Sequence, residues 1–384
     1  MRILLTVPSL APEFGGPTAV AHSLAHAFRA QGHDVTVVGV GESAGPGVVG
    51  LRPLGRFHGT PMTAALHRLP RLVRSADVVH VLGFRDPVGT GAVLAARLYG
   101  VPYVLEPVGM HRQRLRSLRL KAWFDSTIGR PLVNGASRVI ASSSLESEEL
   151  TQDGVARGQI AVRPNGLDLA QYEPLPAPGR FRAALGLCAE TPLVLALGRI
   201  ARKKGLLPLL RAVAGLPRAH LVIAGPDDRD GTLPELLEAR ARLSLEGRVR
   251  ILADGLWGRA KVEALGDADL FCLPSMTENF GIAAAEAAAC GTAVVVSDRC
   301  GVVEWLLDGV EVVPYGNAAA LASTLSRLLA EPAERARLAA AGRSAARRLG
   351  WDRIAGDQLE MYARILDRGR GPTVTSVLAE PVHP

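Results

Sequence analysis

Short apolar runs alternate with amphipathic segments along most of the chain, and this alternation limits its possible folds more than any other feature. The first series has strand patterns at residues 2–7, 35–40, 78–82 and 103–106, with helix patterns at 17–30 and 88–99. Strands that alternate with helices over short connections pair in parallel, with helices on both faces of the sheet. We therefore expect an α/β fold with a doubly wound parallel sheet.

A second series of the same kind begins at Leu193. Its strand patterns lie at residues 193–197, 220–224, 249–252, 270–273 and 293–297, and helix patterns begin near 205, 234 and 281. Between the two series, residues 164–179 are rich in Pro, Gly, Asn and Asp, and a run of three alternating prolines there excludes helix and central strand. The sequence thus predicts two Rossmann-like domains, residues 1–173 and 174–350. Helix patterns return up to 366, and residues 367–384 are expected to form a flexible tail.

The basic balance of the chain does not by itself indicate a nucleic-acid partner. The formal net charge is +7, yet only four of the 44 basic residues are lysine, which is typical of an arginine-rich coding bias. Aromatic residues of the kind that stack on bases do not alternate with the cations. Positive charge is concentrated locally at Arg112 to Lys121. This segment has two possible interpretations, a solvated helix or a contact with an anionic lipid or acceptor.

The four cysteines show no metal-binding spacing, and the amino terminus has no targeting pattern. Cys188, Cys272, Cys290 and Cys300 lack any CxxC pair, which favours reduced thiols over a disulfide or zinc framework. The apolar run in MRILLTVPSL is too short for a signal peptide or a membrane-spanning helix. We expect a cytoplasmic protein with no metal and no cofactor.

Two loops carry residues suited to phosphate. Gly15, Gly16 and Pro17 stand at the start of the first predicted helix, where glycine allows close approach and free amides attract an anion. After the strand that ends at Leu197, Arg199 and Lys204 lie where two cations can converge on a diphosphate. We interpret the neighbouring Lys203 as a solvated charge.

The segment TENFGIAAAEAAACG, residues 277–291, holds two carboxylates with different predicted roles. Glu278 precedes a helix that begins near Gly281, and it can accept hydrogen bonds from vicinal sugar hydroxyls. The amides of Asn279, Phe280, Gly281 and Ile282 surround the helix start, where phosphate oxygens bind well. Glu286 lies inside an alanine-rich helix and needs a partner, either a ribose diol or a structural cation.

These motifs, in this order, resemble those of the retaining GT-B glycosyltransferases known as group 1 or family 4. The resemblance rests on the Gly15 and Gly16 loop, RPNGLDLAQYEP from Arg163, GRIARKKG from Gly198, the Glu278 and Glu286 pair, and Trp351 with Asp352. It implies two Rossmann-like domains facing a central cleft, with the helix at 351–366 crossing back to the first domain. It also implies a nucleotide diphosphate sugar as donor, held by Gly15, Gly16, Arg199, Lys204, Glu278 and Glu286, and no metal.

The chain departs from the family pattern at one position. Where relatives have a histidine in a PHGM-like sequence, this chain reads Glu106, Pro107, Val108, Gly109, Met110, His111. His111 or Glu106 is a candidate replacement, so the candidate catalytic residues are Arg199, Lys204, Glu278, His111 and Glu106. Catalysis can also proceed without one, because the leaving diphosphate can accept the proton of the acceptor hydroxyl.

The resemblance implies retaining transfer of a hexose from a nucleotide diphosphate sugar to a hydroxyl group, and UDP is the nucleotide expected from the family. The acceptor can be a glycan, a lipid-linked sugar or a small metabolite, and Arg112 to Lys121 is a candidate contact with the inner membrane face. Two alternatives stay open: a non-catalytic nucleotide-sugar-binding partner of another transferase, and a nucleotide-sugar epimerase or hydrolase of the same fold.

Overall fold

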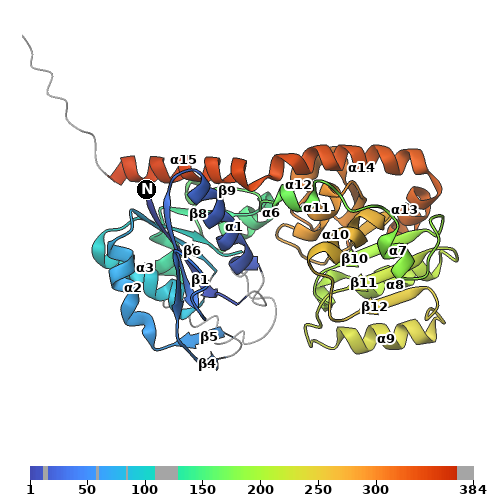
Figure 1. The fold of residues 1–384 in the computed structure, drawn as a ribbon, viewed down its shortest axis with the longest axis horizontal. Coiled ribbons are helices and arrows are strands. Elements are labelled where there is room, and N and C mark those ends of the chain that lie inside the picture. Colours follow the sequence, from blue (N-terminus) through green and yellow to red (C-terminus); the bar gives the residue numbers. More distant parts are fainter. Residues whose placement is uncertain (12–15, 58–59, 84, 109–128, 370–384) are drawn as a thin grey trace, which may run out of the picture. The chain divides into compact units, whose positions relative to one another are not determined.

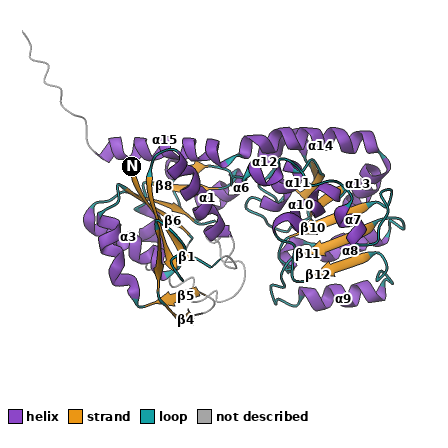
Figure 2. Cartoon of the chain, in the orientation of Figure 1, coloured by secondary structure: helices purple, strands orange, loops and turns teal. Residues whose placement is uncertain are grey.

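The computed structural model of the chain describes residues 1–11, 16–57, 60–83, 85–108 and 129–369. Contacts between residues divide it into two compact units (Figures 1 and 2). The first runs from Met1 to Pro107, includes described residues up to Val139, and takes in the chain from Ala355 onward. The second runs from Ile140 to Ile354 and also includes Val108. Each unit has a parallel sheet with helices, which confirms the α/β fold class.

The seven-stranded sheet has the order β3-β2-β1-β6-β7-β8-β9, and its pairings from β3 to β8 are parallel. Its strands are β1 (Arg2–Ser9), β2 (Asp34–Val40), β3 (Val48–Leu51), β6 (Val78–Leu82), β7 (Tyr103–Glu106), β8 (Arg138–Ala141) and β9 (Ile160–Val162). A separate antiparallel hairpin joins β4 (Pro53–Phe57) to β5 (Thr60–Thr63).

The helices of this part of the chain follow the strands in the predicted alternation. They are α1 (Gly16–Ala30), the 3-10 helix η2 (Ala65–Arg68), α2 (Leu69–Arg74), α3 (Pro87–Tyr99), α5 (Arg130–Asn134) and α6 (Ser144–Gln152). Asp86 caps the start of α3, where its side chain accepts a hydrogen bond from the amide of Gly89 at 2.8 Å, and Gly100 follows the helix in the left-handed conformation. A polar cap and a terminal glycine of this kind fix both ends of a helix.

The six-stranded sheet of the second unit has the order β12-β11-β10-β13-β14-β15, with all pairings parallel. Its strands are β10 (Leu193–Leu197), β11 (His220–Ala224), β12 (Val249–Leu252), β13 (Leu270–Leu273), β14 (Ala293–Ser297) and β15 (Glu311–Val313). Side chains of β10 alternate between two apolar cores, with Leu195 in one and Val194 in the other. Both faces of the sheet are therefore buried, which explains the continuous apolar runs in the sequence.

Helices cover both faces of this sheet. They are α7 (Arg180–Ala184), α8 (Leu206–Ala214), α9 (Thr232–Arg242), α10 (Gly258–Asp267), α11 (Ile282–Ala289), α12 (Val303–Leu306), α13 (Ala318–Ala330) and α14 (Pro332–Ala346). Short 3-10 turns are η4 (Arg157–Gln159), η5 (Leu169–Tyr172), η6 (Arg202–Lys204), η7 (Leu307–Gly309) and η8 (Arg347–Leu349).

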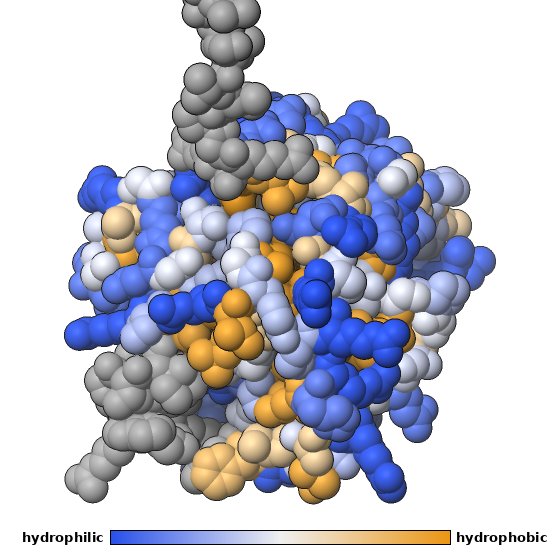
Figure 3. Space-filling model, turned by 90° about the vertical axis from the view of Figure 1, so that its left-hand side faces the viewer, coloured by the Kyte–Doolittle hydropathy of each residue, from blue (hydrophilic) through white to orange (hydrophobic). Residues whose placement is uncertain are grey.

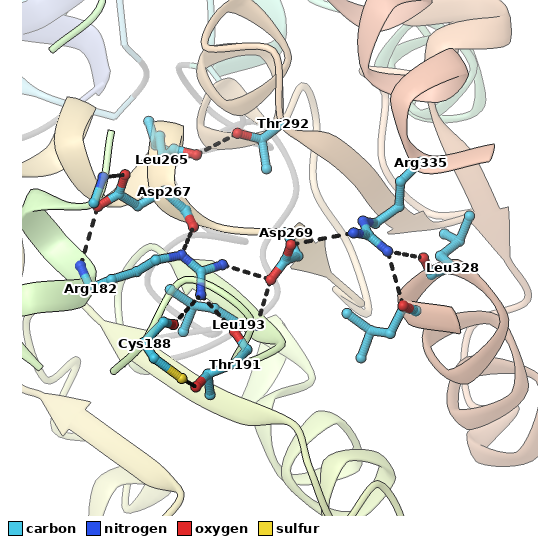
Figure 4. Close-up of polar contacts among 12 residues, drawn as sticks. Arg182, Cys188, Thr191, Leu193, Leu265, Asp267, Asp269, Thr292, Leu328 and Arg335 are labelled. Carbon is cyan, nitrogen blue, oxygen red and sulfur yellow. Dashed lines mark hydrogen bonds and ion pairs between the residues drawn. The ribbon is translucent and has the colours of Figure 1, made fainter. Parts of the chain in front are cut away.

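A buried arginine anchors α7 to the end of α10 (Figure 4). The guanidinium of Arg182 donates to the Asp267 carbonyl at 2.9 Å and to the Asp269 carboxylate at 2.7 Å. The Asp267 carboxylate in turn accepts the amides of Gly179 and Phe181 at 2.6 and 2.7 Å. Figure 4 shows Arg182 lying between the two aspartates, with Arg335 approaching Asp269 from α14. Because the side chain of Arg182 is only 9% exposed, these contacts compensate a charge removed from water.

Helix α15 (Trp351–Gly369) contributes to both units. At its start, a Cβ on Gly166 would lie 2.3 Å from the Trp351 ring, so glycine is required for this close contact. Further along, the Tyr362 hydroxyl lies 2.6 Å from His80 Nδ1, and its ring meets Phe28 edge-on at 5.9 Å. Tyr362 and His80 are fully buried, so the helix from Ala355 onward completes the core of the first unit.

The unit boundaries differ from those drawn from the sequence. The sequence placed the division at residues 173 and 174, whereas contacts change unit between Val139 and Ile140. The residues just after Ala141 belong to the second unit because they are hydrogen-bonded within it. Trp305 Nε1 donates to the Ser142 carbonyl at 3.1 Å, and Glu304 accepts the Ser144 amide at 2.8 Å. The helix expected to end at 366 continues to Gly369, and the rest of the expected tail lies outside the described residues.

Candidate functional site

Glycines form the backbone surface at the carboxyl ends of β10 and β11. A Cβ on Gly225 would lie 1.9 Å from the Gly198 carbonyl oxygen, and one on Gly205 would lie 2.1 Å from the Pro274 carbonyl oxygen. All three glycines have positive φ, which other residues adopt only with strain. The backbones of the loops after β10, β11 and β13 are therefore in direct contact.

The predicted cations lie on this surface, and each has an acidic partner. The Lys204 ammonium binds the Glu278 carboxylate, and both side chains are mostly buried at 15% and 19% exposure. Lys204 also lies against Gly198, with its Nζ 3.6 Å from the Cβ position of that glycine. Arg199 extends into solvent and meets Asp228 at 3.0 Å. The structure thus brings Lys204 and Glu278 together and leaves Arg199 beside them on the same loop.

Lys203 is not the solvated charge that the sequence suggested. Its side chain is partly buried, and burial lowers the pKa of its ammonium, an effect opposed by the negative charge of Glu278. Its carbonyl accepts the amide of Met276 at 2.8 Å, which ties the cationic loop to the loop after β13. The three consecutive cations in the sequence do not reveal that Lys203 and Lys204 are partly buried whereas Arg202 is exposed.

The start of α11 presents unused backbone donors beside Glu278. Gly281 precedes the helix with a φ of 103°, and its carbonyl accepts the Ala284 amide at 2.9 Å. Within the described chain, the amides of Gly281, Ile282 and Ala283 donate to no protein acceptor. Phe280 holds the turn in place, because its side chain is buried and its carbonyl accepts the Val302 amide at 2.6 Å. The Asn279 carbonyl oxygen packs against Gly301, 2.0 Å from the position of a Cβ on that glycine. A helix start with free amides attracts an anion.

Glu286 lies deeper in α11 and already has protein partners. Lys261 on α10 donates to Glu286 Oε1 at 2.7 Å, and the Tyr172 hydroxyl donates to the same oxygen at 3.1 Å. Burial raises the pKa of Tyr172, and the nearby charge of Glu286 raises it further, so this phenol stays a donor. The structural cation that the sequence left as an alternative for Glu286 is therefore present, while its carboxylate remains 14% exposed.

Two of the remaining predicted residues, Glu106 and Gly16, lie in the first unit. Glu106 is buried and its Oε2 lies 3.0 Å from His80 Nε2, so it belongs to the buried set that includes Tyr362. Gly16 is the first residue of α1. Gly15 and His111 lie outside the described residues, as does the cationic run from Arg112 to Lys121. Val108 has a φ of 49°, an unfavourable conformation for a β-branched residue.

Lys261, Tyr172 and Asp228 were not anticipated as part of this region. Lys261 is one of only four lysines in the chain, and this rarity is the sequence feature that could have singled it out. No group of three or more His, Cys, Asp or Glu side chains able to hold a metal ion occurs in the described part of the chain.

Together these residues define a class of site: cations and free amides for an anion, next to a carboxylate for hydroxyl groups, at the carboxyl edge of a parallel sheet. Residues 179–345 match the family described as glycosyl transferases group 1, and residues 15–166 match the glycosyl transferase 4-like domain. The chain is 36% identical to a D-inositol 3-phosphate glycosyltransferase of Xylanimonas cellulosilytica, over 76% of this chain and 73% of the relative. It is 31% identical to an alpha-maltose-1-phosphate synthase of Mycolicibacterium smegmatis, over 72% and 76% of the two chains.

The chain belongs to the group 1 glycosyltransferases and is a glycosyltransferase enzyme. This confirms the family inferred from the motifs. Its fold is GT-B, as in Anabaena Alr3699/HepE in complex with UDP and glucose, with a TM-score of 0.76 at 20% identity over 95% of this chain and 100% of that one. Sucrose-phosphate synthase from Thermosynechococcus elongatus gives a TM-score of 0.75 at 22% identity, over 96% and 100%. In the described residues, no helix is long and apolar enough to cross a membrane.

Proposed function

We propose that this enzyme transfers a hexose, with retention of anomeric configuration, from a nucleotide diphosphate sugar to an acceptor hydroxyl. The observation that carries the proposal is the contact between Lys204 and Glu278 beside the free amides at the start of α11. These groups match the two halves of such a donor, an anionic diphosphate and a polyhydroxylated sugar. We propose a UDP-linked donor, in keeping with the UDP complexes of a protein that shares the fold.

The diphosphate would be held by Arg199, Lys204 and the amides of Gly281 and Ile282. Arginine can bridge two phosphate oxygens, whereas Lys204 acts as a compact positive charge. These fixed charges would stabilise the diphosphate as it leaves, without a metal ion. Glu278 would accept hydrogen bonds from sugar hydroxyls and lie near the positive charge that develops at the anomeric carbon.

In the proposed reaction, the bond between the anomeric carbon and the diphosphate oxygen breaks. A new bond forms from the acceptor oxygen to the same face of that carbon, and the acceptor proton passes to the leaving diphosphate. The products are an α- or β-glycoside with the configuration of the donor, and a nucleoside diphosphate. This route uses no protein base, which fits the presence of Val108 at the position of the family histidine.

A two-stage experiment tests the proposal. A thermal-shift screen with UDP-, GDP- and ADP-sugars identifies the donor, since a bound ligand raises the melting temperature by mass action. Turnover of that donor and NMR of the product anomeric centre are then measured for wild type, for Arg199→Ala with Lys204→Ala, and for Arg202→Ala. Arg202 lies in the same loop but is 61% exposed and pairs with Glu235, so it is the matched control.

We expect the double variant to lose turnover almost completely and the Arg202 variant to retain it. An inverted product, or equal turnover in the double variant and the control, would overturn the proposed mechanism. Donor binding with neither transfer nor hydrolysis in the wild type would instead favour the non-catalytic binding partner.

A further inference from the structure

Arg199, which the proposed function places at the donor diphosphate, pairs with an acidic side chain of a neighbouring loop. Its Nη1 donates to Asp228 Oδ1 at 3.0 Å, and Asp228 lies on the loop after β11. The side chain of Arg199 is 65% exposed and that of Asp228 is 28% exposed. An ion pair as exposed as this one contributes little to the free energy of unfolding. Folding stability alone therefore does not explain the contact.

Exposed charge by itself carries little meaning on this protein. Figure 3 shows hydrophilic side chains, drawn in blue, over much of the face that it draws. Two further cations of the same loop also pair with acids, Arg202 with Glu235 and Lys204 with Glu278. Arg202 has no proposed role at the donor, and Glu278 has its own proposed role at the donor sugar. The Arg199 pair differs from both, because its acid has no role yet and binds a cation intended for an anionic ligand.

The backbone fixes the position of Asp228 beside the loop after β10. Ile200 and Asp227 form a parallel bridge that continues the pairing of β10 with β11. The Asp228 amide donates to the Ile200 carbonyl at 3.1 Å, and the Ile200 amide donates to the Pro226 carbonyl at 2.9 Å. Arg199 has a long, exposed side chain on this paired backbone. The arginine is therefore the member of the pair that can change position.

Asp228 and the start of α11 lie on opposite sides of β10. In the order β12-β11-β10-β13, strands β11 and β13 flank β10, and all three pairings are parallel. The loops after β11 and β13 therefore begin at the same edge of the sheet, about 10 Å apart. Asp228 holds Arg199 towards β11, whereas α11 and its free amides follow β13. A diphosphate bound at those amides would have to draw Arg199 away from Asp228.

We propose that Asp228 is a positioning residue that competes with the diphosphate for Arg199, and that it thereby limits the affinity of the enzyme for nucleoside diphosphates. The inference rests on the proposed function, because it takes Arg199 as a ligand of the diphosphate. The same diphosphate group enters with the donor and leaves with the product, and product release limits the turnover of many enzymes. Asp228 would therefore weaken donor binding and speed the release of the nucleoside diphosphate.

Calorimetric titration of the full chain with UDP, GDP and ADP tests the inference, and the nucleotide that binds most tightly is used for the variants. Asp228→Asn removes the charge and keeps the size, whereas Asp228→Glu keeps the charge. Glu235→Gln is the matched control, because Glu235 is 41% exposed and pairs with Arg202 of the same loop. Arg199→Gln, alone and with Asp228→Asn, completes a double-mutant cycle. Circular dichroism establishes that each variant is folded.

We expect Asp228→Asn to lower the Kd about fivefold, because two unit charges about 4 Å apart in water interact with that strength. The constant for product inhibition of donor turnover should fall by the same factor, and the gain should shrink at high salt. Asp228→Glu and Glu235→Gln should bind like wild type. Arg199→Gln should weaken binding about tenfold, and adding Asp228→Asn to it should change nothing further.

Three results would overturn this inference and leave the proposed function intact. Asp228→Asn may not bind more weakly than or equally to wild type, since weaker binding would show that Asp228 orients Arg199 for the diphosphate. An equal gain in Glu235→Gln would assign the effect to overall charge. A gain that persists in the Arg199→Gln background would exclude action through Arg199. Wild type that binds none of the three nucleotides, or Arg199→Gln that binds like wild type, would overturn the proposed function as well.

Discussion

Lys204 and Glu278 bind one another through their charged groups at the carboxyl ends of β10 and β13. The proposed donor would compete for both partners, because its diphosphate attracts the ammonium and its sugar hydroxyls bind the carboxylate. The ion pair therefore holds both side chains in position before the donor arrives. Because each side chain is proposed to bind a different part of the donor, substitutions of the two residues should have different effects.

Neutral substitutions at the two positions should act differently on binding and on transfer. Lys204→Gln removes the cation, so the Kd for the nucleoside diphosphate should rise about 10- to 100-fold. Glu278→Gln frees Lys204, so that Kd should stay the same or fall, while sugar transfer should drop about 100-fold or more. Calorimetry with the nucleoside diphosphate and steady-state kinetics measure the two effects. Parallel losses of nucleotide affinity in both variants would contradict this assignment.

Gly166 should be intolerant of even one added methyl group. In Gly166→Ala the new Cβ would lie 2.3 Å from the Trp351 ring, and overpacking of this kind costs about 1–3 kcal/mol. Gly158 has nothing within 4 Å of its Cβ position, so Gly158→Ala is the matched control and should change stability little. Urea unfolding followed by tryptophan fluorescence measures both. Equal midpoints for the two variants would show that Trp351 moves aside without cost.

Strands that are buried on both faces could be predicted closely from the sequence, whereas exposed or very short strands could not. Strands 193–197, 220–224 and 270–273 were placed at their observed bounds, because both faces of the sheet are buried and their apolar runs end at turn residues. The β4 strand was missed: all five of its residues are exposed, so it has no apolar pattern. Strand β9 has only three residues and carries too little pattern to detect.

The candidate site was predictable to the extent that it follows strand ends. Lys204 and Glu278 stand just beyond β10 and β13, and parallel strands bring such positions together. Lys261 and Tyr172 come from the middle of α10 and from a 3-10 turn, so their meeting at Glu286 depends on how helices pack. No local pattern in the sequence encodes that contact.

Arg182 should be among the residues most important for stability. Arg182→Ala would leave Asp269 without its nearest cation and remove bonds to the carbonyls of Asp267 and Thr191, which we expect to cost about 3–5 kcal/mol. Two positions earlier, Arg180 is 60% exposed and lies 3.7 Å from Glu263, so Arg180→Ala should cost about 0.5 kcal/mol or less. Thermal unfolding of both variants measures the difference. A small effect at Arg182 would mean that Arg335 compensates Asp269 alone.

Asp86 should make the protein less stable as pH rises. Burial raises the pKa of this carboxyl to about 6, above its unfolded value, although hydrogen bonds from backbone amides oppose the shift. Its contribution is therefore fully present below the unfolded pKa and is lost as pH rises through about 6. The loss approaches about 3 kcal/mol. Asp86→Asn keeps the helix cap and should be the more stable protein at about pH 8, with the advantage lost at about pH 4.

Asp77 provides the opposite control for this experiment. A hydrogen bond from Arg2 holds the pKa of Asp77 below its usual value. Its contribution is therefore present above the unfolded pKa and is lost as pH falls, so Asp77→Asn should weaken the protein at neutral pH. Melting temperatures across the pH range compare the two variants. Parallel pH profiles for Asp77→Asn and Asp86→Asn would contradict the burial argument.

The contact between Tyr362 and His80 also determines the order in which the protein can be completed on the ribosome. Nearly all described residues of the second unit come from one stretch, Ile140 to Ile354, with Val108 added from earlier in the chain, so this unit can fold as soon as that stretch emerges. The first unit is synthesised earlier, yet its core stays open until α15 delivers Tyr362. The part of the chain that is made first is therefore finished last, and until then the nascent protein exposes apolar surface that chaperones can bind.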